Sequence, residues 1–363
     1  MQALVVTPGQ KNSTRLTGVP TPRPGPRQAL VRVLEVGLDG TDREIAEGLY
    51  GGAPAGQDYL IIGHESLGQV EEVGPEVEKI RPGDLVVATV RRPDDCINCR
   101  AGESDNCLKG DYLERGIKGL HGFLAEYYVE DEAFLVKVPR ELRNVGVLLE
   151  PQSIVEKAIF QTYKIQERMV WEPKTAVVTG AGTIGLLTTM LLRLKGLEVY
   201  AYSRGKEDEP EARIAQDTGA SYASSENFTL EQLSARIGRN IDLIVETTGS
   251  AHMILRSMFV LGTNGVLSLL GISAGQTQLT LCMDCLNLRI VLGNKVVFGS
   301  VNANRSYFEM GATDMLAFER NWPGLLGRLI TRREPILAGA KMLDKKPGDI
   351  KVVVDLSRGP RMV

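Results

Sequence analysis

The feature that most constrains the fold is a glycine-rich turn near the middle of the chain. Residues 180–185 have the sequence GAGTIG; they follow the apolar run TAVVT and open the apolar stretch LLTTMLLRLKG. Glycine lets backbone N–H groups approach a pyrophosphate, and the N-terminus of the following helix favours its charge. We therefore predict that the turn binds a dinucleotide through Gly180, Ala181, Gly182, Thr183, Ile184 and Gly185. A glycine turn without a ligand is the alternative.

The sequence around this turn has two different textures. From about Lys174, apolar runs alternate with helical patterns, the runs being TAVVTG, EVYAYS, IDLIVETTG, GVLSLLG and VVFGS. Such alternation predicts parallel strands with crossover helices. Residues 1 to about 150 instead contain short β-segments, such as ALVRVLEV (29–36) and GDLVVATV (83–90), separated by Gly and Pro turns. The prediction is an α/β chain with a barrel-like β-domain and a doubly wound parallel sheet.

The domain boundaries follow from these textures. A chain of 363 residues is long enough for two hydrophobic cores, because single cores stop growing near ~250 residues. The tail is helical at first and then strand-like at IKVVVDL, so we expect it to fold back onto the N-terminal domain. We predict one domain over residues 1–154, completed by 306–363, and a second over 155–305.

Charge and composition restrict the partners. The formal net charge of -3 provides no basic field for nucleic acid, so we expect a small-molecule ligand. The first residues, MQALVVTPGQ, lack the features of a secretory signal, which favours a cytoplasmic location. Residues 175–192 are uncharged and about as long as a membrane span, but their glycines and threonines follow a strand–turn–helix order. We expect no membrane partner.

The end of the second apolar run predicts the type of dinucleotide. An NAD enzyme usually has an acidic residue there, about 20 residues beyond the glycines. This chain has Ser203 and Arg204, with Lys206 close by. A guanidinium pairs bidentately with phosphate oxygens, so we predict NADP, with NAD as the second choice. The alternative is an exposed basic turn neutralised by the acidic residues 207–209.

Two polar motifs lie in the β-rich region. GHE (63–65) lies between two β-runs, and GLDGTD (37–42) follows another strand. Their arrangement resembles the medium-chain zinc alcohol dehydrogenase superfamily, in which the corresponding motifs supply catalytic zinc ligands. The resemblance implies a GroES-like catalytic domain followed by a Rossmann domain. This sequence has Asp39 where the superfamily pattern usually has cysteine, and carboxylate oxygen is a harder zinc ligand than thiolate.

Further segments are similar to archaeal-type glucose dehydrogenases within that superfamily: LEPQSIVEKA (149–158), VRRP (90–93), ERGI (114–117), GLHG (119–122) and NKVVFGSVNAN (294–304). The resemblance implies that the catalytic zinc lies among Asp39, His64, Glu65 and Glu150. It implies sugar contacts from Thr41, Thr89, Glu114, Glu150 and Asn302. The side chain of Ile154 cannot form a hydrogen bond, so it cannot supply a hydrogen-bonding contact to a sugar hydroxyl from that position. We also place in the cofactor site the ends of two later strands, Leu270, Gly271, Ile272, Ser300, Val301 and Asn302.

These residues predict a reaction. Zinc would polarise the C1 hydroxyl of a pyranose, most simply that of D-glucose, and the nicotinamide would accept the C1 hydride to give a lactone. Asp39, His64 and Thr41 form the predicted catalytic set, with Thr41 on the path of the departing proton. The alternatives are a polyol or secondary-alcohol dehydrogenase, and a non-catalytic NADPH-binding protein. The resemblance also implies a homodimer or homotetramer.

The five cysteines favour metal binding in a reducing compartment over a disulfide framework. Relatives hold a structural zinc with the pattern C-x2-C-x2-C-x7-C, but the first position here is Pro93. The remaining thiols are Cys96, Cys99 and Cys107, so we predict Asp94, or else Asp95, as the fourth ligand. Free thiols in a lobe without metal are the alternative. We interpret the pair Cys282 and Cys285 as non-metal, and His121 and His252 as structural or exposed.

Overall fold

The computed structural model describes residues 1–272 and 275–357, and the chain forms two compact units. The first unit comprises Met1–Ser153, Asn302–Leu316 and the chain from Ile330 onward; the second comprises Ile154–Val301 and Ala317–Leu329. Residues 317–329, expected in the first domain, therefore group with the second unit. There the short helix α10 (Leu325–Leu329) packs against α5 (Pro210–Asp217), and Arg328 pairs with Asp217.

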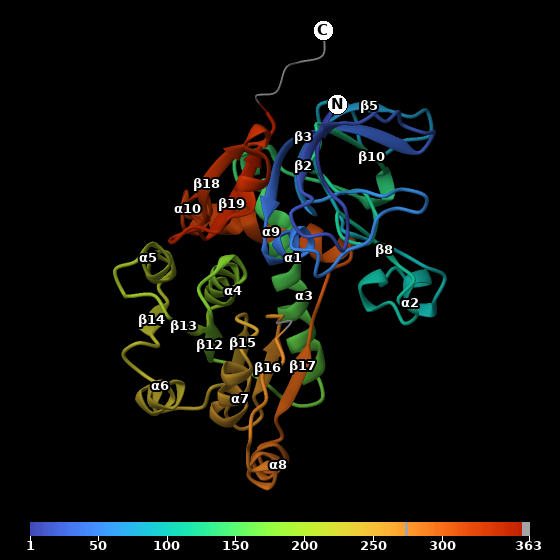
Figure 1. Cartoon of the computed structure of the whole chain (residues 1–363). Coiled ribbons are helices and arrows are strands. Elements are labelled where there is room, and N and C mark those ends of the chain that lie inside the picture. The colour runs from blue at the N-terminus through green and yellow to red at the C-terminus, as the bar shows by residue number, and fades with distance from the viewer. Residues whose placement is uncertain (273–274, 358–363) are drawn as a thin grey trace. The chain divides into compact units, whose positions relative to one another are not determined.

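The first unit is built mainly from β-strands (Figure 1). One sheet has the order β11-β6-β5-β3-β19-β18, with β10 also paired to β3; two three-stranded sheets have the orders β2-β1-β4 and β7-β8-β9. The strands are β1 (Gln2–Val6), β2 (Arg15–Gly18), β3 (Gln28–Leu38), β4 (Leu60–Ile61), β5 (Glu65–Val73), β6 (Leu85–Ala88), β7 (Arg91–Arg92), β8 (Leu113–Arg115), β9 (Gly119–Leu120), β10 (Tyr127–Asp131), β11 (Leu135–Lys137), β18 (Ile330–Pro335) and β19 (Lys351–Asp355). Their inward apolar side chains form one core.

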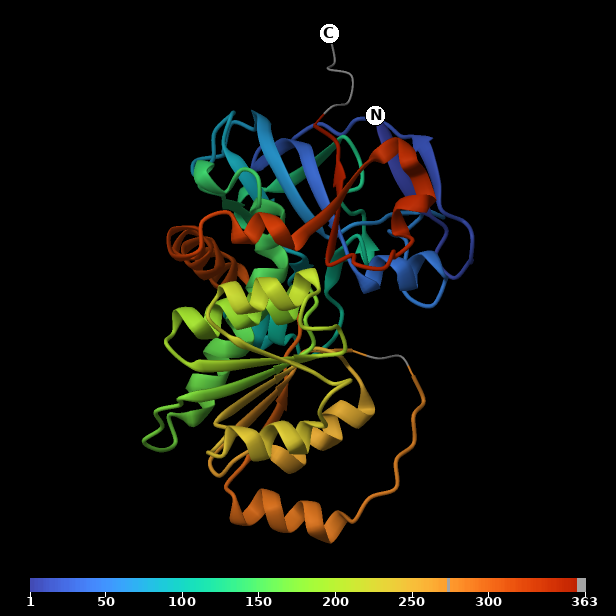
Figure 2. The same cartoon turned by 90° about the vertical axis from the view of Figure 1, so that its left-hand side faces the viewer.

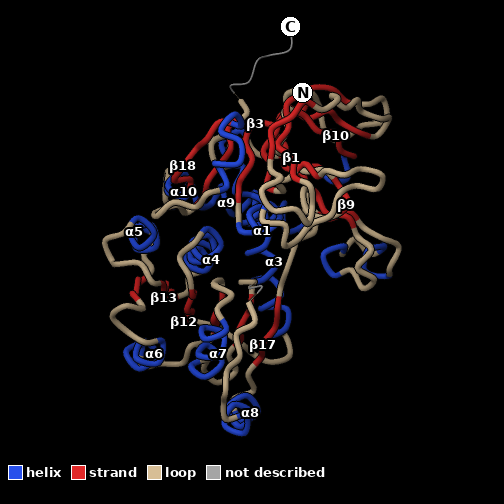
Figure 3. Tube along the Cα trace, viewed as in Figure 1, coloured by secondary structure: helices blue, strands red, loops and turns tan. Residues whose placement is uncertain are grey.

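Helices in and around this unit are few. They are α1 (Gly40–Ala46), α2 (Ile97–Arg100), the first residues of α3 (Leu149–Gln166) and the first part of α9 (Arg305–Asn321). Short 3-10 turns lie at Ser104–Asn106, Glu132–Phe134, Arg140–Leu142, Gly146–Leu148 and Ile336–Leu343. Figure 3 shows how loops and strands outweigh helices here.

The C-terminal strand completes the sheet, as the apolar run IKVVVDL predicts. β19 pairs antiparallel with β3, where Val352 faces Leu38, and β18 runs parallel to β19. The side chains of Val352, Val353 and Val354 are buried. This pairing brings Lys351 to the end of β3, immediately before α1.

The second unit is a six-stranded parallel sheet with helices on both faces. Its strands are β12 (Thr175–Thr179), β13 (Glu198–Ser203), β14 (Ser221–Ser224), β15 (Leu243–Glu246), β16 (Val266–Leu269) and β17 (Val296–Gly299), in the order β14-β13-β12-β15-β16-β17. Figure 2 shows α4 (Thr183–Leu194) and α5 on one face, and α6 (Leu230–Ile237) and α7 (Ala251–Val260) on the other. The strand order reverses between β12 and β15, which is where doubly wound sheets bind ligands.

All five apolar runs of this half form strands, so the predicted parallel sheet is confirmed. β14 was not predicted, because SYAS is short and half polar, and neither was α8 (Met283–Leu292). Residues 175–192 fold as β12 and part of α4. Across the described ranges, none of the helices has the length and apolarity that a membrane crossing requires.

Candidate active site

Asp39 begins the first polar cluster because it caps α1. Its Oδ1 accepts the backbone N–H groups of Thr41 and Asp42 at 2.8 and 3.3 Å, and the Thr41 hydroxyl donates to its Oδ2 at 3.3 Å. Asp42 completes a capping box by accepting the Asp39 N–H at 3.1 Å. Aspartate is a preferred N-cap residue. The segment LDGTD therefore fixes the Asp39 carboxylate before any ligand binds.

His64 lies between these two carboxylates. Its Nε2 is 3.8 Å from Asp39 Oδ2, and its Nδ1 is 3.7 Å from Asp42 Oδ1. Burial alone would lower the pKa of His64, but the carboxylates of Asp39 and Asp42 outweigh it and raise that pKa well above its ordinary value. For Asp39, burial alone would raise the pKa of the carboxyl group. The positive charges of His64 and Lys351 outweigh burial, so the pKa of Asp39 is lowered. Sequence reasoning did not assign a role to Asp42, although it lies in the motif that pointed to Asp39.

Glu65 is held by a lysine that sequence reasoning missed. Lys351 Nζ donates to both Glu65 oxygens at 2.7 Å and to the carbonyl of Leu38 at 3.3 Å. Burial is the main reason that the pKa of Glu65 is raised, although Lys351 opposes the shift. Gly37 is required here, because a Cβ at that position would lie 1.9 Å from Glu65 Oε2. Glu65 is therefore committed to an internal ion pair.

Glu150, at the start of α3, is the remaining predicted ligand. One of its oxygens lies within 4.8 Å of a potential metal-ligand atom of His64 and of one of Glu65. Burial, reinforced by the charges of Glu65 and Asp39, raises the pKa of Glu150 to about 8. A raised carboxyl pKa in a buried group marks negative charge that its surroundings do not fully offset.

These groups fit a divalent metal. Two sets of ligand atoms share His64: one adds Asp39 and Asp42, the other Glu65 and Glu150. Zinc takes imidazole nitrogen and carboxylate oxygen, and a dication would offset the crowded carboxylates. The buried Nδ1 of His64 has no hydrogen-bond partner among the described residues. The structure thus brings Asp39, His64, Glu65 and Glu150 into one neighbourhood, with Glu65 already bound to Lys351.

Two predicted sugar residues are in direct contact. Asn302 Nδ2 donates to Glu114 Oε1 at 3.0 Å, and Asn302 has a left-handed backbone with φ 60°. Arg91 Nε and Nη2 donate to the same oxygen at 3.1 and 2.9 Å. The Arg91 guanidinium lies 3.7 Å from the centre of the Tyr112 ring. Glu114 is buried, and its hydrogen bonds to Arg91 and Asn302, the side-chain bonds found for it among the described residues, all involve Oε1. The sequence had not assigned a role to Arg91.

Thr89 is buried, and its hydroxyl oxygen accepts from Arg92 Nη1 at 3.2 Å. The neighbouring Arg92 and Arg115 both bind Glu130, the latter through Nε at 2.9 Å. No hydrogen bond joins Thr89 to Glu114 or Asn302 within the described part of the chain. Its place at the sugar stays a prediction.

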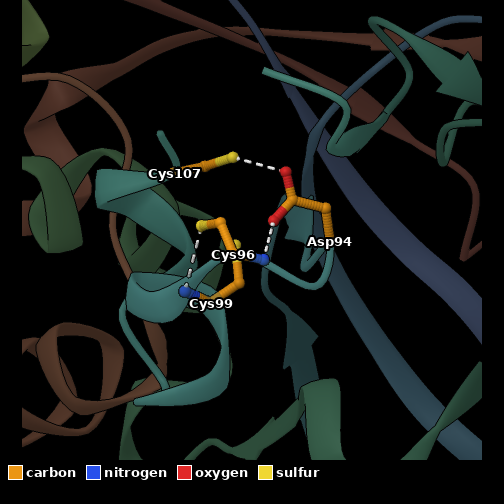
Figure 4. Close-up of side chains that lie close together, drawn as sticks. All are labelled: Asp94, Cys96, Cys99 and Cys107. Carbon is orange, nitrogen blue, oxygen red and sulfur yellow. Dashed lines mark hydrogen bonds between the residues drawn. The ribbon is translucent and has the colours of Figure 1, made fainter. Parts of the chain in front are cut away.

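Asp94, Cys96, Cys99 and Cys107 form a separate cluster (Figure 4), with one ligand atom from each within 4.8 Å of the others. Asp94 accepts the Cys107 thiol at 2.8 Å and the Cys96 N–H at 2.8 Å. The backbone N–H groups of Cys99 and Leu108 point at Cys96 Sγ at 3.5 Å. This is the set of four expected from the sequence, with Asp94 rather than Asp95 at the fourth position.

The electrostatics of this cluster suit a cation. Burial, followed by the nearby Asp94 carboxylate, raises the pKa of Cys99 to about 12. Backbone N–H groups lower the pKa of Cys96, and hydrogen bonds from Cys107 and the Cys96 backbone lower that of Asp94. Three sulfurs and one carboxylate form a donor set for tetrahedral zinc. Asp95 instead pairs with Lys109.

In the second unit the glycine turn has the geometry expected of a phosphate cradle. Gly180 has φ 98°, and a Cβ on Gly185 would lie 2.0 Å from the Gly180 carbonyl oxygen. A Cβ on Gly182 would meet nothing within 4 Å, so the backbone there is open. Gly182 is the N-cap residue of α4 and makes no side-chain capping bond, and the N-terminus of a helix favours a bound anion. Thr183 and Ile184 begin that helix.

Ser203, Arg204 and Lys206 lie where β13 ends. Arg204 and Lys206 are exposed, and neither side chain forms an ion pair with residues 207–209 or with any other residue that the structure describes. The acidic neighbours therefore do not neutralise the basic pair through direct contacts. This geometry leaves both cations available to a 2′-phosphate.

The remaining predicted cofactor residues follow β16 and β17. Leu270 and Gly271 both donate their N–H groups to the Glu246 carbonyl, at 2.8 and 3.0 Å. The Glu246 carboxylate, which is fully buried, accepts the N–H groups of Thr248 and Gly249 at 2.8 and 3.0 Å and so shapes the adjoining loop. Ile272 is exposed next to Gly271. Sequence reasoning did not single out Glu246.

Ser300 follows β17, and its buried Oγ has no hydrogen-bond partner within residues 1–272 and 275–357. The Val301 carbonyl accepts from Lys157 Nζ at 2.9 Å. Asn302 belongs to the first unit. An unsatisfied buried hydroxyl beside the carboxyl ends of the strands is available to a polar ligand.

The remaining predictions concern two histidines, expected to be structural or exposed, and the pair Cys282 and Cys285, expected to bind no metal. His121 accepts the Ile61 N–H and stacks on Tyr59, so its role is structural, and His252 is exposed. Cys282 and Cys285 form a disulfide, which the sequence analysis did not predict.

Comparisons with known proteins agree with this fold and site. A model of the alcohol dehydrogenase GroES-like domain matches residues 25–140, and a model of the glucose dehydrogenase C-terminus matches residues 143–356. The chain is therefore an oxidoreductase of the alcohol dehydrogenase type. A glucose 1-dehydrogenase of Methanocella arvoryzae is 48% identical over 98% of this chain and 99% of its own. One of Thermoproteus tenax is 42% identical over the same shares.

A solved structure supports the same assignment. Glucose dehydrogenase of Haloferax mediterranei, in complex with NADP, Zn and gluconolactone, is 33% identical, with a TM-score of 0.88 over 98% of this chain and 99% of that one. The chain belongs to the glucose 1-dehydrogenase family.

Proposed function

We propose that the protein oxidises D-glucose at C1 to D-glucono-1,5-lactone, passing the hydride to NADP+, with NAD+ as a second acceptor. The observation that carries the proposal is the buried His64, whose ring lies near the Asp39 carboxylate in one group of potential ligands and near Glu150 in the other. His64 belongs to the same compact unit as the Glu114–Asn302 pair. A metal-binding group combined with fixed hydrogen-bonding groups suits a polyhydroxylated substrate better than a simple alcohol. The named relatives support glucose.

Asp39, His64 and Glu150 would hold a zinc ion, with Glu65 turned toward Lys351. The bound metal would supply a Lewis acid that lowers the pKa of a sugar hydroxyl. Thr41 donates its hydroxyl to Asp39 Oδ2 at 3.3 Å, so it can pass a proton from the sugar toward a carboxylate. The fixed cap of α1 keeps Thr41 and Asp39 in this relation before substrate arrives.

Glu114 and Asn302 would bind sugar hydroxyls, with Thr89 as a further contact. Arg91 and Asn302 together occupy Glu114 Oε1, so Glu114 Oε2 is the oxygen left to accept from a hydroxyl. Carboxylate acceptors of this kind favour substrates that present a donor at that position.

The glycine turn, Ser203, Arg204 and Lys206 would bind NADP. Phosphate pairing by the exposed basic residues predicts a preference for NADP+ over NAD+. Replacing Arg204 by alanine should lower kcat/KM for NADP+ about tenfold, as one charged hydrogen bond is worth, and leave that for NAD+ nearly unchanged. An unaltered ratio would remove Arg204 from the site.

The main test is a steady-state panel of aldoses, polyols and secondary alcohols with both cofactors, repeated after chelation and after zinc is restored. Glucose should give the highest kcat/KM, with activity lost on chelation and recovered with zinc. Preference for an open-chain polyol would replace the proposed substrate. Tight NADPH binding without turnover would contradict an enzymatic function.

The proposal also covers a second metal site, an oligomeric state and a location in the cell. A second zinc in the Asp94, Cys96, Cys99 and Cys107 cluster predicts two zinc ions per chain, against one if the cluster stays metal-free. A homodimer or homotetramer is supported by the exposed apolar side chains of α8, Leu288, Val291 and Leu292. A cytoplasmic location is supported by the three free thiols.

A further inference from the structure

The chain uses the spacing C-x2-C twice, with two different outcomes. Cys96 and Cys99 are free thiols that gather with Asp94 and Cys107. Cys282 and Cys285 are joined by a disulfide, with their Cα atoms 5.3 Å apart. In the part of the chain that the structure describes, the second pair belongs to no group of potential metal ligands. A metal therefore does not account for it.

Stabilisation of the fold does not account for it either. The stabilisation that a disulfide gives through chain entropy grows with the length of the loop it closes. This bridge links residues only three apart, so its contribution is small. The first turn of α8 is closed without it, since the Leu286 N–H donates to the Cys282 carbonyl at 3.1 Å. The disulfide therefore adds little to the stability of the first turn of α8.

The position of the pair is suited to reaction. Both cysteines are exposed, and α8 lies at the outer side of the second unit in Figures 1 and 2. Cys282 caps the ten-residue helix, and the backbone N–H of Cys285 points at its Sγ at 3.3 Å. Helix N-terminal N–H groups stabilise a thiolate. Exposed disulfides are the ones that exchange readily.

We propose that Cys282 and Cys285 form a thiol–disulfide exchange site whose substrate is a dithiol. A thiolate of the dithiol attacks Cys285 Sγ, the bond to Cys282 breaks, and the Cys282 thiolate leaves under the N–H groups of α8. The second thiolate of the dithiol then attacks the mixed disulfide. The dithiol is released as a disulfide, two electrons pass to the protein, and two protons are taken up by its thiols.

Oxidation runs the same steps in reverse: the Cys285 thiolate attacks the oxidised dithiol, and the Cys282 thiolate then attacks Cys285 Sγ in the mixed disulfide and releases the dithiol. Reduction opens the covalent link in the first turn of α8 and leaves that turn to its hydrogen bonds. The site is independent of the proposed glucose oxidation, because it uses no residue of the metal, sugar or cofactor clusters.

The test equilibrates the full-length, zinc-loaded protein with mixtures of reduced and oxidised dithiothreitol, traps thiols with a maleimide, and locates the label by mass spectrometry. Label at Cys282 and Cys285 should rise together along a two-electron curve, whereas Cys96, Cys99 and Cys107 should not follow it. Each of Cys282→Ser and Cys285→Ser should abolish the transition. Thiols free in every mixture, or a bridge that persists in fully reduced dithiothreitol, would overturn the proposal.

A second measurement separates the two sulfurs. The Cys282 thiol in Cys285→Ser should be alkylated at pH 7 about tenfold faster than the Cys285 thiol in Cys282→Ser, because only the former accepts the helix N–H groups. Equal rates would overturn the role given to Cys282.

Discussion

Lys351 and Glu65 form a buried ion pair in which the ammonium group donates to both carboxylate oxygens at 2.7 Å and each side chain is 3% exposed. Removing one partner of such a pair leaves a buried charge without compensation. We expect Lys351→Met to lower the free energy of unfolding by about 3–5 kcal/mol, measured by urea denaturation.

Lys346 offers a matched control. Its side chain is exposed and lies 3.6 Å from the half-buried Glu334, so Lys346→Met should change the free energy of unfolding by about 0–1 kcal/mol. The double variant Lys351→Met with Glu65→Gln should recover part of the loss, because it removes the unpaired charge. A Lys351→Met variant as stable as the wild type would contradict the buried pair.

Arg91 should act on substrate affinity through Glu114. The two guanidinium N–H bonds to Glu114 Oε1 fix the other oxygen, and lysine cannot reproduce both bonds together with stacking on Tyr112. We expect Arg91→Lys to raise KM for glucose about tenfold, from the loss of one charged hydrogen bond, with kcat and KM for NADP+ changed much less.

A double-mutant cycle separates this positioning role from a general structural one. Once Glu114→Gln has removed the carboxylate, adding Arg91→Lys should raise KM for glucose little further. Effects that multiply in the double variant would show that Arg91 acts elsewhere.

Glu130 should contribute to stability in a defined range of pH. Burial alone would raise the pKa of Glu130, but the guanidinium groups of Arg115 and Arg92 outweigh it and hold that pKa below 4.5. The unfolded chain then takes up this proton first as the pH falls. The contribution is complete above pH 4.5 and is lost as the pH falls through the lower, folded value.

We therefore expect Glu130→Gln to be less stable at pH 7 and to lose stability less steeply than the wild type below pH 4.5, in urea titrations at each pH. Glu309→Gln breaks an exposed ion pair with Arg305 and should leave the slope unchanged. Equal slopes for Glu130→Gln and wild type would refute the assignment.

Local patterns predicted most of the fold, and contacts between distant segments account for what was missed. The runs that became β12, β13, β15, β16 and β17 are apolar because both faces of a parallel sheet are covered. Lys351, by contrast, is 286 residues from Glu65. The pair exists only because β19 adds to β3, and no periodicity of the sequence records that pairing.

In the candidate site, too, residues in short motifs were predicted, whereas roles that depend on contacts in the folded chain were not. Asp39 and His64 were predicted because each lies in a short motif with a recognisable order. Asp42 lies in one of those motifs, but its contacts with Gly63 and His64 arise from the folded position of α1. Arg91 was quoted only as part of a segment, and its link to Glu114 depends on the pairing of β7 with β8.

Asp39 gives the sharpest test of the metal site, because it serves both as a helix cap and as a predicted ligand. Asp39→Ala removes both, so we expect a loss of zinc-dependent turnover together with about 0.5–2 kcal/mol of stability. Asp39→Asn keeps a capping oxygen and should retain stability while losing most of the bound catalytic zinc and the turnover. Asp39→Cys restores an anionic zinc ligand and should keep measurable activity. Zinc per chain, kcat and the urea midpoint, measured on all three variants, separate ligation from capping, and full activity in Asp39→Ala would show that Asp39 binds no essential metal.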